Sequence, residues 1–358
     1  MKTTKHAIVG VGVIGDWHVR ILGKQMQHRS QLLAVCDLDV EKAKKSLDKH
    51  GLQHVPVFAD EKEMLAKVPD IEVVHVATPS GAHADPSILA MEAGKHVIVE
   101  KPIEITLPKI DRMLDTAQKR GVRVAGIFQN RWNKANRAIK DAAAAGRFGK
   151  ITFGGSYTPW YRTDQYYRDG GWRGTWALDG GGAIMNQSVH SVDLLQWIVG
   201  PVKQVSAYAS SLIHPEIEVE DTLASAVVFE NGAYGHLMGS TAIYPGGAVR
   251  VEVGGSDGMA VSESGLKVYR FRGDDAAQEA DKALIESINA TRSKTTAGGS
   301  SPTDLPTDLH QFNIEHILDS WAAGKDADTN GVEARKAVAI IVALYESAKK
   351  GGVPVKVS

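Results

Sequence analysis

The sequence predicts an α/β protein of two domains, a doubly wound parallel sheet followed by an α+β domain with an open, mostly antiparallel sheet. Three observations predict it. Short apolar runs alternate with helical stretches over the first 130 residues, consecutive strand-like runs fill the region after residue 150, and a glycine-rich turn joins the first strand to the first helix. Because 358 residues exceed one typical hydrophobic core, we expect domains at 1–130 and 131–358.

The first domain contains apolar runs of strand length separated by segments with helical spacing. Strands that are apolar throughout are typical of a parallel sheet covered on both faces. The predicted strands lie in 7–12, 32–37, 55–60, 72–79, 96–102 and 123–128, and the predicted helices span 16–29, 40–49, 60–67, 82–93 and 106–120. A linking helix is expected over 134–146, where Gly146 ends it.

The sequence of the second domain predicts a meandering, largely antiparallel sheet. Turn signals such as Asn231-Gly232 separate its strands, and a Gly/Ser/Thr-rich stretch at 291–304 is expected to be a surface loop. The predicted strands lie in 151–160, 202–210, 221–230, 233–243, 248–255, 259–264 and 266–272, and two late helices are expected near 307–323 and 331–349.

Composition excludes several classes of protein. The net charge of −1 gives no reason to expect a nucleic-acid partner, and no apolar run reaches the roughly 18 residues of a membrane helix. The single cysteine, Cys36, excludes an internal disulfide, and its apolar surroundings predict a buried strand residue. With no signal-peptide pattern at the start, we expect a cytoplasmic protein.

The glycine-rich turn fits the pattern G-x-G-x-x-G with Gly10, Gly12 and Gly15, and Val13 and Ile14 between the last two. Such glycines permit a tight turn, a close approach of the backbone to a pyrophosphate, and close packing of helix on strand. Asp37 follows Gly15 by 22 residues, which suits a carboxylate on the adenosine ribose. A carboxylate there repels a 2′-phosphate, so the sequence favours NAD over NADP.

Lys101 follows the fifth predicted strand in the run Val99-Glu100-Lys101-Pro102. Ligands of doubly wound sheets bind outside the carboxyl ends of the strands, so Lys101 is expected where a nicotinamide and a substrate meet. A lysine can donate a hydrogen bond to a substrate oxygen and stabilise negative charge on it. A solvated surface lysine is the alternative.

A third run, residues 180–193, places an amide, an imidazole and a carboxylate at helical spacing. Asn186, His190 and Asp193 are four and three residues apart and are expected on one face of a helix. Together they suit a site that holds a hydroxylated ligand and moves its proton. The alternative is an ordinary first helical turn with satisfied polar caps.

These three motifs, in this order, resemble the glucose–fructose oxidoreductase, inositol dehydrogenase and MocA family (Gfo/Idh/MocA) over nearly the full length. The resemblance implies a Rossmann domain followed by a domain whose sheet often makes subunit contacts, and activity on a carbinol of a sugar, sugar acid or cyclitol. It implies that Lys101 activates the reacting hydroxyl and that His190 is the acid/base. Asn186 departs from the aspartate of many members, so it can only position a ligand, as in Asn-Gln variants among sugar and sugar-acid dehydrogenases. Asp193 either orients the imidazole or is structural.

Other candidates follow from the resemblance and from composition. His83 is a cofactor contact or a surface histidine, and Arg173 with Trp172 could cover the cofactor. The remaining expected cofactor contacts are Thr78, Pro79, Glu100 and Asn130. Residues 157–176 carry seven Trp and Tyr with interleaved charges, which suits a carbohydrate held by Tyr166 and Arg168, or alternatively a subunit interface.

The sequence therefore predicts an NAD-dependent dehydrogenase of a small carbohydrate or polyol, with no metal ligand motif, active as a homodimer or homotetramer through its C-terminal sheet. Two alternatives remain open. One is a redox-neutral enzyme that oxidises a sugar transiently so that a glycosidic bond can be eliminated, and the other is a non-catalytic sensor of dinucleotide or sugar.

Overall fold

The computed structural model describes residues 3–290 and 307–358, which form two compact units. The first unit contains the residues up to Phe128 together with Thr307–Arg335, and the second contains the described residues from Gln129 to Ala290 together with Lys336–Ser358.

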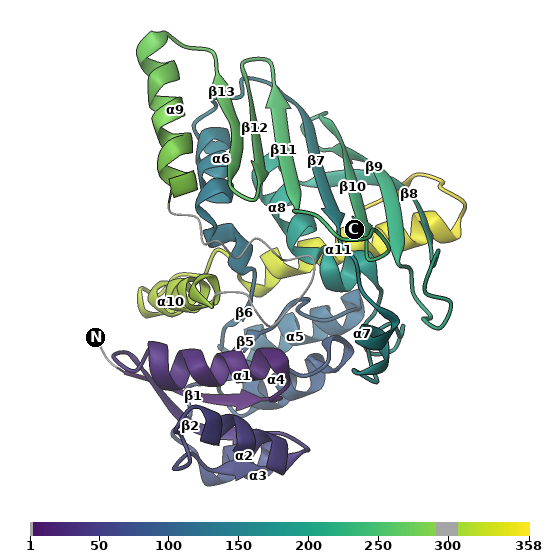
Figure 1. Cartoon of the computed structure of the whole chain (residues 1–358). Helices are drawn as coiled ribbons and strands as arrows, with labels where there is room; N and C mark the ends of the chain where they lie inside the picture. Colours follow the sequence, from purple (N-terminus) through teal and green to yellow (C-terminus); the bar gives the residue numbers. More distant parts are fainter. Residues whose placement is uncertain (1–2, 291–306) are drawn as a thin grey trace. The chain divides into compact units, whose positions relative to one another are not determined.

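The first unit is built on a six-stranded parallel sheet in the order β3-β2-β1-β4-β5-β6 (Figure 1). This is the strand order of a Rossmann fold, and the chain reverses direction across the sheet between β1 and β4. The strands are β1 (Thr4–Val9), β2 (Ser30–Cys36), β3 (Val57–Phe58), β4 (Val73–Val76), β5 (His96–Val99) and β6 (Val124–Gly126).

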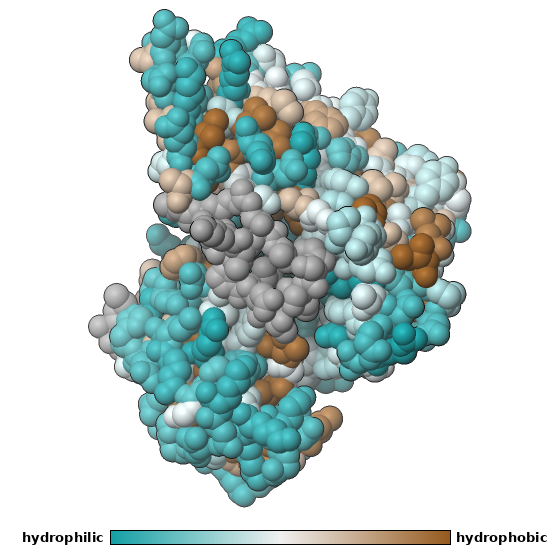
Figure 2. Space-filling view, in the orientation of Figure 1, coloured by the Kyte–Doolittle hydropathy of each residue, from teal (hydrophilic) through white to brown (hydrophobic). Residues whose placement is uncertain are grey.

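Helices connect these strands, and charged side chains dominate the surface of α2 and α3, the hydrophilic base of the view in Figure 2. A later helix, α10 (Asp308–Ala322), returns to this unit and buries Ile314, Ile317 and Trp321 in the same core as Ile8 and Val35. The connecting helices are α1 (Val13–Arg20), its π-helical continuation η1 (Ile21–Gln25), α2 (Val40–Lys49), α3 (Glu61–Lys67), the 3₁₀ turn η2 (Ser80–Ala82), α4 (Ala84–Glu92) and α5 (Leu107–Arg120).

The second unit is built on an eight-stranded sheet in the order β13-β12-β11-β7-β10-β9-β8-β14. It is not one continuous meander, because the first of its strands, β7, lies in the middle, antiparallel to β11 and parallel to β10. The strands are β7 (Ile151–Pro159), β8 (Val202–Ser210), β9 (Thr222–Phe229), β10 (Tyr234–Ser240), β11 (Arg250–Gly255), β12 (Gly258–Glu263), β13 (Leu266–Phe271) and β14 (Val355–Lys356).

One face of this sheet carries helices (Figure 1). Thr158 of β7 hydrogen-bonds Ser191 of α8 (Val189–Val199) through their hydroxyls at 3.1 Å, and a Cβ at Gly154 would meet Val199 at 2.6 Å. The other helices of the unit are α6 (Lys134–Ala144), α7 (Asp164–Arg168), α9 (Asp275–Ala290) and the greater part of α11 (Gly331–Lys349), with short helical turns η3 (Gln129–Trp132) and η4 (Ala183–Gln187).

The predicted strands of both sheets agree with these elements, and Cys36 is buried at the end of β2. Several other features differ from the prediction. The segment 307–335 belongs to the first unit, α7, α9 and β14 have no predicted counterpart, and the helix expected in the run 180–193 is a π-helical turn followed by α8. The loop expected at 291–304 lies outside the described residues. No helix in the described part of the chain is long and apolar enough to cross a membrane.

Candidate active site

The glycine-rich turn between β1 and α1 has the geometry of a dinucleotide cradle. A Cβ at Gly15 would meet the carbonyl oxygen of Gly10 at 2.1 Å, and a Cβ at Gly10, where φ is +90°, would meet the backbone of Ala77 at 2.7 Å. Both positions therefore require glycine. A Cβ at Gly12 would meet nothing within 4 Å, so open space lies where a pyrophosphate would approach the backbone. Val13 at this turn is 43% exposed.

Asp37 follows β2 directly and lies beside this turn. Its Oδ2 accepts from Val11 N at 2.6 Å, and its Oδ1 accepts from Asp39 N at 2.9 Å. Lys42 lies 3.3 Å from the same carboxylate, whose side chain is 10% exposed. These contacts fix the carboxylate at the edge of the cradle, where a ribose hydroxyl can reach it.

Lys101 is half-buried beyond the end of β5, and Glu100 beside it is buried. Glu100 accepts from His18 Nε2 at 2.8 Å and from the Lys101 backbone N–H at 3.1 Å. Burial alone would raise the pKa of Glu100, but the hydrogen bond from His18, followed by the electrostatic effects of His310, His18 and Lys101, outweighs it and lowers this pKa to about 2. A permanent carboxylate therefore lies next to the lysine that the sequence singled out.

His83 is buried with only 1% of its surface exposed, so the surface alternative is wrong. Its Nε2 lies 2.9 Å from Thr78 O, and its Nδ1 lies 2.8 Å from Pro102 O. The ring thus connects the turn after β4 with the turn after β5, and burial lowers its pKa. Thr78 and Pro79 are half-buried in the first of these turns. This geometry assigns His83 to support of the two turns, and its contact with the cofactor stays a prediction.

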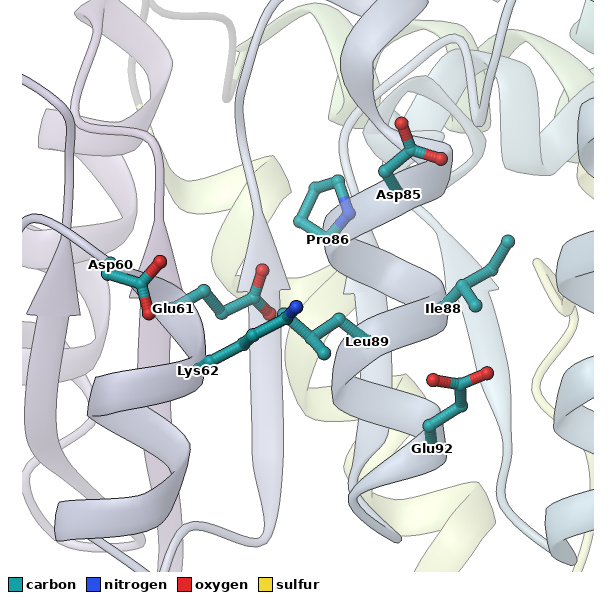
Figure 3. Close-up of a pocket in the computed structure, with 8 residues that line it drawn as sticks. All are labelled: Asp60, Glu61, Lys62, Asp85, Pro86, Ile88, Leu89 and Glu92. Carbon is teal, nitrogen blue, oxygen red and sulfur yellow. The ribbon is translucent and has the colours of Figure 1, made fainter.

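A cavity of about 470 Å³ lies in the same unit between α3 and α4 (Figure 3). Glu61 of α3 and Leu89 of α4 lie close together on its walls in this view, and Glu92 and Asp85 mark two ends of the α4 side. None of the predicted cofactor residues lines it. The cavity is therefore separate from the dinucleotide cradle.

In the second unit, Glu220 organises the run 180–193. Its Oε2 accepts from Gly182 N at 3.0 Å, and its Oε1 accepts from Ile184 N at 2.9 Å and from the Tyr345 hydroxyl at 2.9 Å. These bonds satisfy the first amides of the π-helical turn η4, so Glu220 sets how this turn leads into α8. Burial raises the pKa of Glu220 to about 7 despite these donors.

The side chain of Asn186 belongs to a network of polar groups at this turn. Its Nδ2 donates to Asp179 Oδ1 at 2.6 Å, and its Oδ1 accepts from Gln187 Nε2 at 3.1 Å. Gln187 Nε2 also donates to the Tyr166 hydroxyl at 2.8 Å, while Gln187 Oε1 accepts from Arg162 at 3.0 Å. Arg162 is buried, so a guanidinium, an amide and a phenol meet beside Asn186. His190 is half-buried one turn further, at the start of α8.

Asp193 does not share the half-buried environment of His190. It is 1% exposed and accepts two hydrogen bonds from Arg131, which is equally buried, at 2.7 and 2.5 Å. The Arg131 guanidinium also lies over the Trp197 ring at 5.2 Å. This buried pair anchors α8 to η3, and η3 also carries the half-buried Asn130. Asp193 therefore acts on a ligand only through the position of α8.

The aromatic loop separates into two environments. Arg168 is exposed and forms an ion pair with Glu216 at 3.3 Å. Arg173, by contrast, lies over the Tyr166 ring at 4.4 Å and over the Trp172 ring at 5.7 Å. The sequence did not single out Asp179 or Glu220, and the partners that give Glu220 its role lie far away in the chain. Arg162 carried a signal only as one of the interleaved charges of 157–176, and Gln187 only as the residue after Asn186 in the Asn-Gln variant.

Comparison with known protein families identifies both units. Residues 4–128 match the model of an oxidoreductase family with an NAD-binding Rossmann fold, and residues 136–261 match the C-terminal domain model of the GFO/IDH/MocA family. The chain belongs to the Gfo/Idh/MocA family. It is therefore an NAD-binding oxidoreductase, and the open cradle at Gly12 fits that cofactor.

Relatives in the Gfo/Idh/MocA family carry several substrate names. The inositol 2-dehydrogenase of Salmonella paratyphi B is 28% identical over 65% of this chain and 69% of its own length. The D-glucoside 3-dehydrogenase of Escherichia coli is 29% identical over 63% of this chain and 67% of its own. The WlbA dehydrogenase of Chromobacterium violaceum, solved with NADH and UDP-GlcNAcA, is 30% identical over 100% of this chain and 97% of its own, with a TM-score of 0.87.

Proposed function

We propose that this protein is an NAD-dependent dehydrogenase that acts on a carbinol of a sugar, a sugar acid or a cyclitol. The observation that carries the proposal is that two sequence motifs together supply the side chains that oxidation of an alcohol needs. Lys101 lies at the carboxyl end of β5 in the Rossmann unit, beside the carboxylate of Glu100, and His190 and Asn186 lie together where α8 begins in the second unit. These are the polariser, the acid/base and the positioning amide that oxidation of an alcohol requires.

The roles of the side chains follow from their chemistry. NAD, when bound, supplies the hydride acceptor of the reaction. Lys101 donates a hydrogen bond to the reacting oxygen and stabilises negative charge on it. His190 accepts the hydroxyl proton, because an imidazole nitrogen can take up a proton, whereas the ammonium of Lys101 and the amide of Asn186 cannot. Asn186 has no proton to exchange and holds the substrate.

The polar network beside Asn186 favours a hydroxylated ligand that also carries negative charge. Arg162 and Arg173 both place a guanidinium against the Tyr166 ring, at 5.3 and 4.4 Å from its centre. Guanidinium groups bind carboxylates in pairs of hydrogen bonds, and an aromatic ring suits the C–H face of a sugar. We therefore favour a sugar acid among the candidate substrates. The relative solved with UDP-GlcNAcA supports this preference.

We further propose NAD rather than NADP as the working cofactor. Asp37 is held at the cradle by Val11 N, and its carboxylate would repel a 2′-phosphate. Lys42 partly offsets this charge at 3.3 Å, so the preference is expected to be a ratio of affinities that a titration can measure, rather than complete exclusion.

A panel assay tests the proposal. The protein is mixed anaerobically with NAD and, in separate reactions, with uronates, neutral pyranoses and inositols, and the absorbance of NADH is followed. We expect oxidation of at least one uronate. If NAD binds, no candidate is oxidised, and NADH reduces none of the corresponding keto-sugars, the proposal is wrong. If the cofactor co-purifies with the protein and turnover produces no net NADH, the redox-neutral alternative is favoured instead.

Two substitutions assign the roles. Lys101→Met and His190→Asn are expected to lower kcat by about 10²- to 10⁴-fold while NAD binding stays within a few fold. Lys95→Met is the matched control, because Lys95 directly precedes the same strand at its opposite end and its ammonium donates to Pro69 O at 2.7 Å. An unchanged activity in all three variants would favour the non-catalytic sensor.

A further inference from the structure

The Rossmann unit contains a row of buried histidines that ends on Glu100. His6 of β1, His75 of β4 and His18 of α1 are each no more than 1% exposed. His6 Nδ1 lies 3.0 Å from His75 Nε2, His75 Nδ1 lies 3.0 Å from His18 Nδ1, and His18 Nε2 lies 2.8 Å from Glu100 Oε1. Four side chains from four elements therefore form one continuous line of hydrogen bonds in the core.

This row is not a metal site. Its ring nitrogens face one another in pairs, whereas metal ligands direct their lone pairs at a common point. Within residues 3–290 and 307–358, no group of three or more His, Cys, Asp or Glu side chains is arranged to hold a metal ion. The row therefore needs an explanation in terms of its own protons.

The contacts determine where those protons lie. Glu100 is an anion and can only accept, so His18 Nε2 carries a hydrogen. In a neutral His18 the other nitrogen then accepts, so His75 Nδ1 must donate to it. By the same step His75 Nε2 accepts and His6 Nδ1 donates. Every N–H of the row thus points toward Glu100.

The opposite arrangement is self-consistent only if His18 is an imidazolium, which places a hydrogen on His6 Nε2. His6 Nε2 is buried, and it has no hydrogen-bond partner among the residues that the structure describes. A buried donor without an acceptor is costly, so the neutral arrangement is favoured. Burial lowers the pKa of His6 to about 3 and that of His75 well below its usual value, which also favours neutral rings.

Other charged groups near the row do not change this assignment. Glu72 raises and Arg29 lowers the pKa of His6, and burial remains the largest effect there. His310 of α10 lies 3.6 Å from Glu100 Oε1, and burial lowers its pKa to about 4. The positive charge of Lys101, the group that the proposed function uses, also lowers the pKa of Glu100.

We propose that His75, with His6 behind it, is a positioning residue of the dehydrogenase: it holds His18 in the tautomer that donates to Glu100, and so keeps the carboxylate beside Lys101 charged and fixed in orientation. This inference rests on the proposed role of Lys101. His75 itself touches neither Glu100 nor Lys101 and acts through two successive hydrogen bonds.

Ring ¹⁵N chemical shifts of histidine-labelled protein test the row without any substrate. We expect the wild-type protein to show hydrogens on Nδ1 of His6 and His75 and on Nε2 of His18. In His75→Leu nothing donates to His18 Nδ1, so the His18 shifts should change. In His75→Gln the side-chain amide can donate to His18, so these shifts should return toward wild type. Hydrogen on Nε2 of His75 in the wild type overturns the proposal, whatever the variants do.

Kinetics test the consequence, with the panel compound that the wild type oxidises fastest. His75→Leu should lower kcat about three- to tenfold, because Glu100 is less firmly oriented beside Lys101 when His18 loses its donor. His75→Gln should restore kcat, with KM unchanged throughout. The control is His96→Gln, a histidine of β5 outside the row that accepts from Arg123 N.

A loss of activity in His75→Leu that glutamine does not rescue means a merely structural role and overturns the inference. If no panel compound is oxidised by the wild type, the proposed function fails, and the ring shifts alone still decide whether the row is built as described.

Discussion

At the scale of single residues, Asp179 gives a physical reason for Asn186. The resemblance to the family implies an aspartate at this position in many members. Here the Asn186 amide donates to Asp179 Oδ1 at 2.6 Å, and Asp179 is 1% exposed. Its other oxygen accepts from Gly174 N at 2.8 Å. A second carboxylate at this distance could not be ionised together with the first, so an amide is the compatible partner.

Asn186→Asp is therefore expected to destabilise the second unit in a pH-dependent way. At about pH 8 two carboxylates compete for one proton, and we expect the free energy of unfolding to fall by about 1–3 kcal/mol. Near pH 5 the pair shares a proton, and the loss should be smaller. Urea unfolding at both pH values measures the difference.

The double variant Asp179→Asn with Asn186→Asp is the control for this pair. It exchanges the two groups, and the new asparagine can still accept from Gly174 N while its amide donates to the new aspartate. Stability at about pH 8 should largely return. An equal loss in the single and double variants would show that packing, rather than charge, explains the asparagine.

Residue types alone predicted candidates but not their partners. The spacing of His190 and Asp193 placed them on one helix face, and the structure separates them, because Arg131 takes the Asp193 carboxylate into a buried ion pair. The alternative of a surface position for His83 failed for a similar reason, since two backbone carbonyls bind its ring in the core. Such pairings join residues far apart in the sequence, and no local pattern reports them.

At the scale of elements, local periodicity was sufficient wherever an element buries an apolar stripe. Strands β1 and β4 are buried on both faces, and α5 has a buried side formed by Ile110, Met113 and Ala117. Helix α9 was missed because it lacks such a stripe. Its one buried residue is Asp281, which accepts from Arg147 at 2.9 Å. The π-helical form of η4 likewise depends on Glu220 and Tyr345, which no periodicity in 180–193 could indicate.

The first turn of α3 contains a carboxyl group in an unfavourable place. Burial and the charge of Asp60 raise the pKa of Glu61 to about 8. Its Oε1 is buried without a hydrogen-bond partner within the described residues, next to the cavity of Figure 3. An ionised Glu61 therefore costs stability that a protonated one does not.

Glu61→Gln is expected to stabilise the protein at high pH only. Because the folded pKa lies above the unfolded one, the wild type loses stability as the pH rises from about 4.5 to about 8, and glutamine removes this loss. We expect a gain of roughly 1–3 kcal/mol near pH 9 and little change near pH 5, reduced from the full shift because the side chain is half-buried. Urea unfolding at the two pH values measures both.

Glu63→Gln is the matched control on the same helix. Glu63 is 48% exposed and pairs with Lys67, so its substitution should change stability by a few tenths of a kcal/mol at most, without this dependence on pH. A gain in Glu61→Gln that is equally large near pH 5 would point to improved packing instead of removed charge.

At the scale of the whole chain, the division at residue 130 was close to the end of the first unit at Phe128, but the return of Thr307–Arg335 to that unit was not foreseen. The apolar positions of α10 predict a buried face without saying which core receives it. Ile314 and Trp321 would suit either domain by composition, and only the three-dimensional packing places them with Ile8. Local patterns in a single sequence do not indicate which of two cores receives a helix that is distant along the chain.

The open face of the large sheet is the other whole-chain feature. Tyr234, Phe153 and Met259 lie in one row across the strands, since Tyr234 pairs with Phe153, Phe153 with Gly254, and Gly254 with Met259. They are 68%, 37% and 42% exposed. Tyr208, on the same face, is 69% exposed. Exposed apolar side chains gathered on one face are typical of an interface, and here we propose a second copy of the chain as its partner.

Tyr234→Glu is expected to convert the proposed homo-oligomer to a monomer. A two-fold interface repeats each residue, so the substitution places two desolvated charges in the contact and costs far more than one. Analytical ultracentrifugation should show a lower mass, while circular dichroism stays unchanged because Tyr234 is exposed within the single chain. Phe312→Glu is the control, an aromatic of α10 that is 47% exposed in the other unit and should leave the mass unchanged. A wild type that sediments as a monomer, or a Tyr234→Glu variant that keeps the wild-type mass, would show that this face is not the interface.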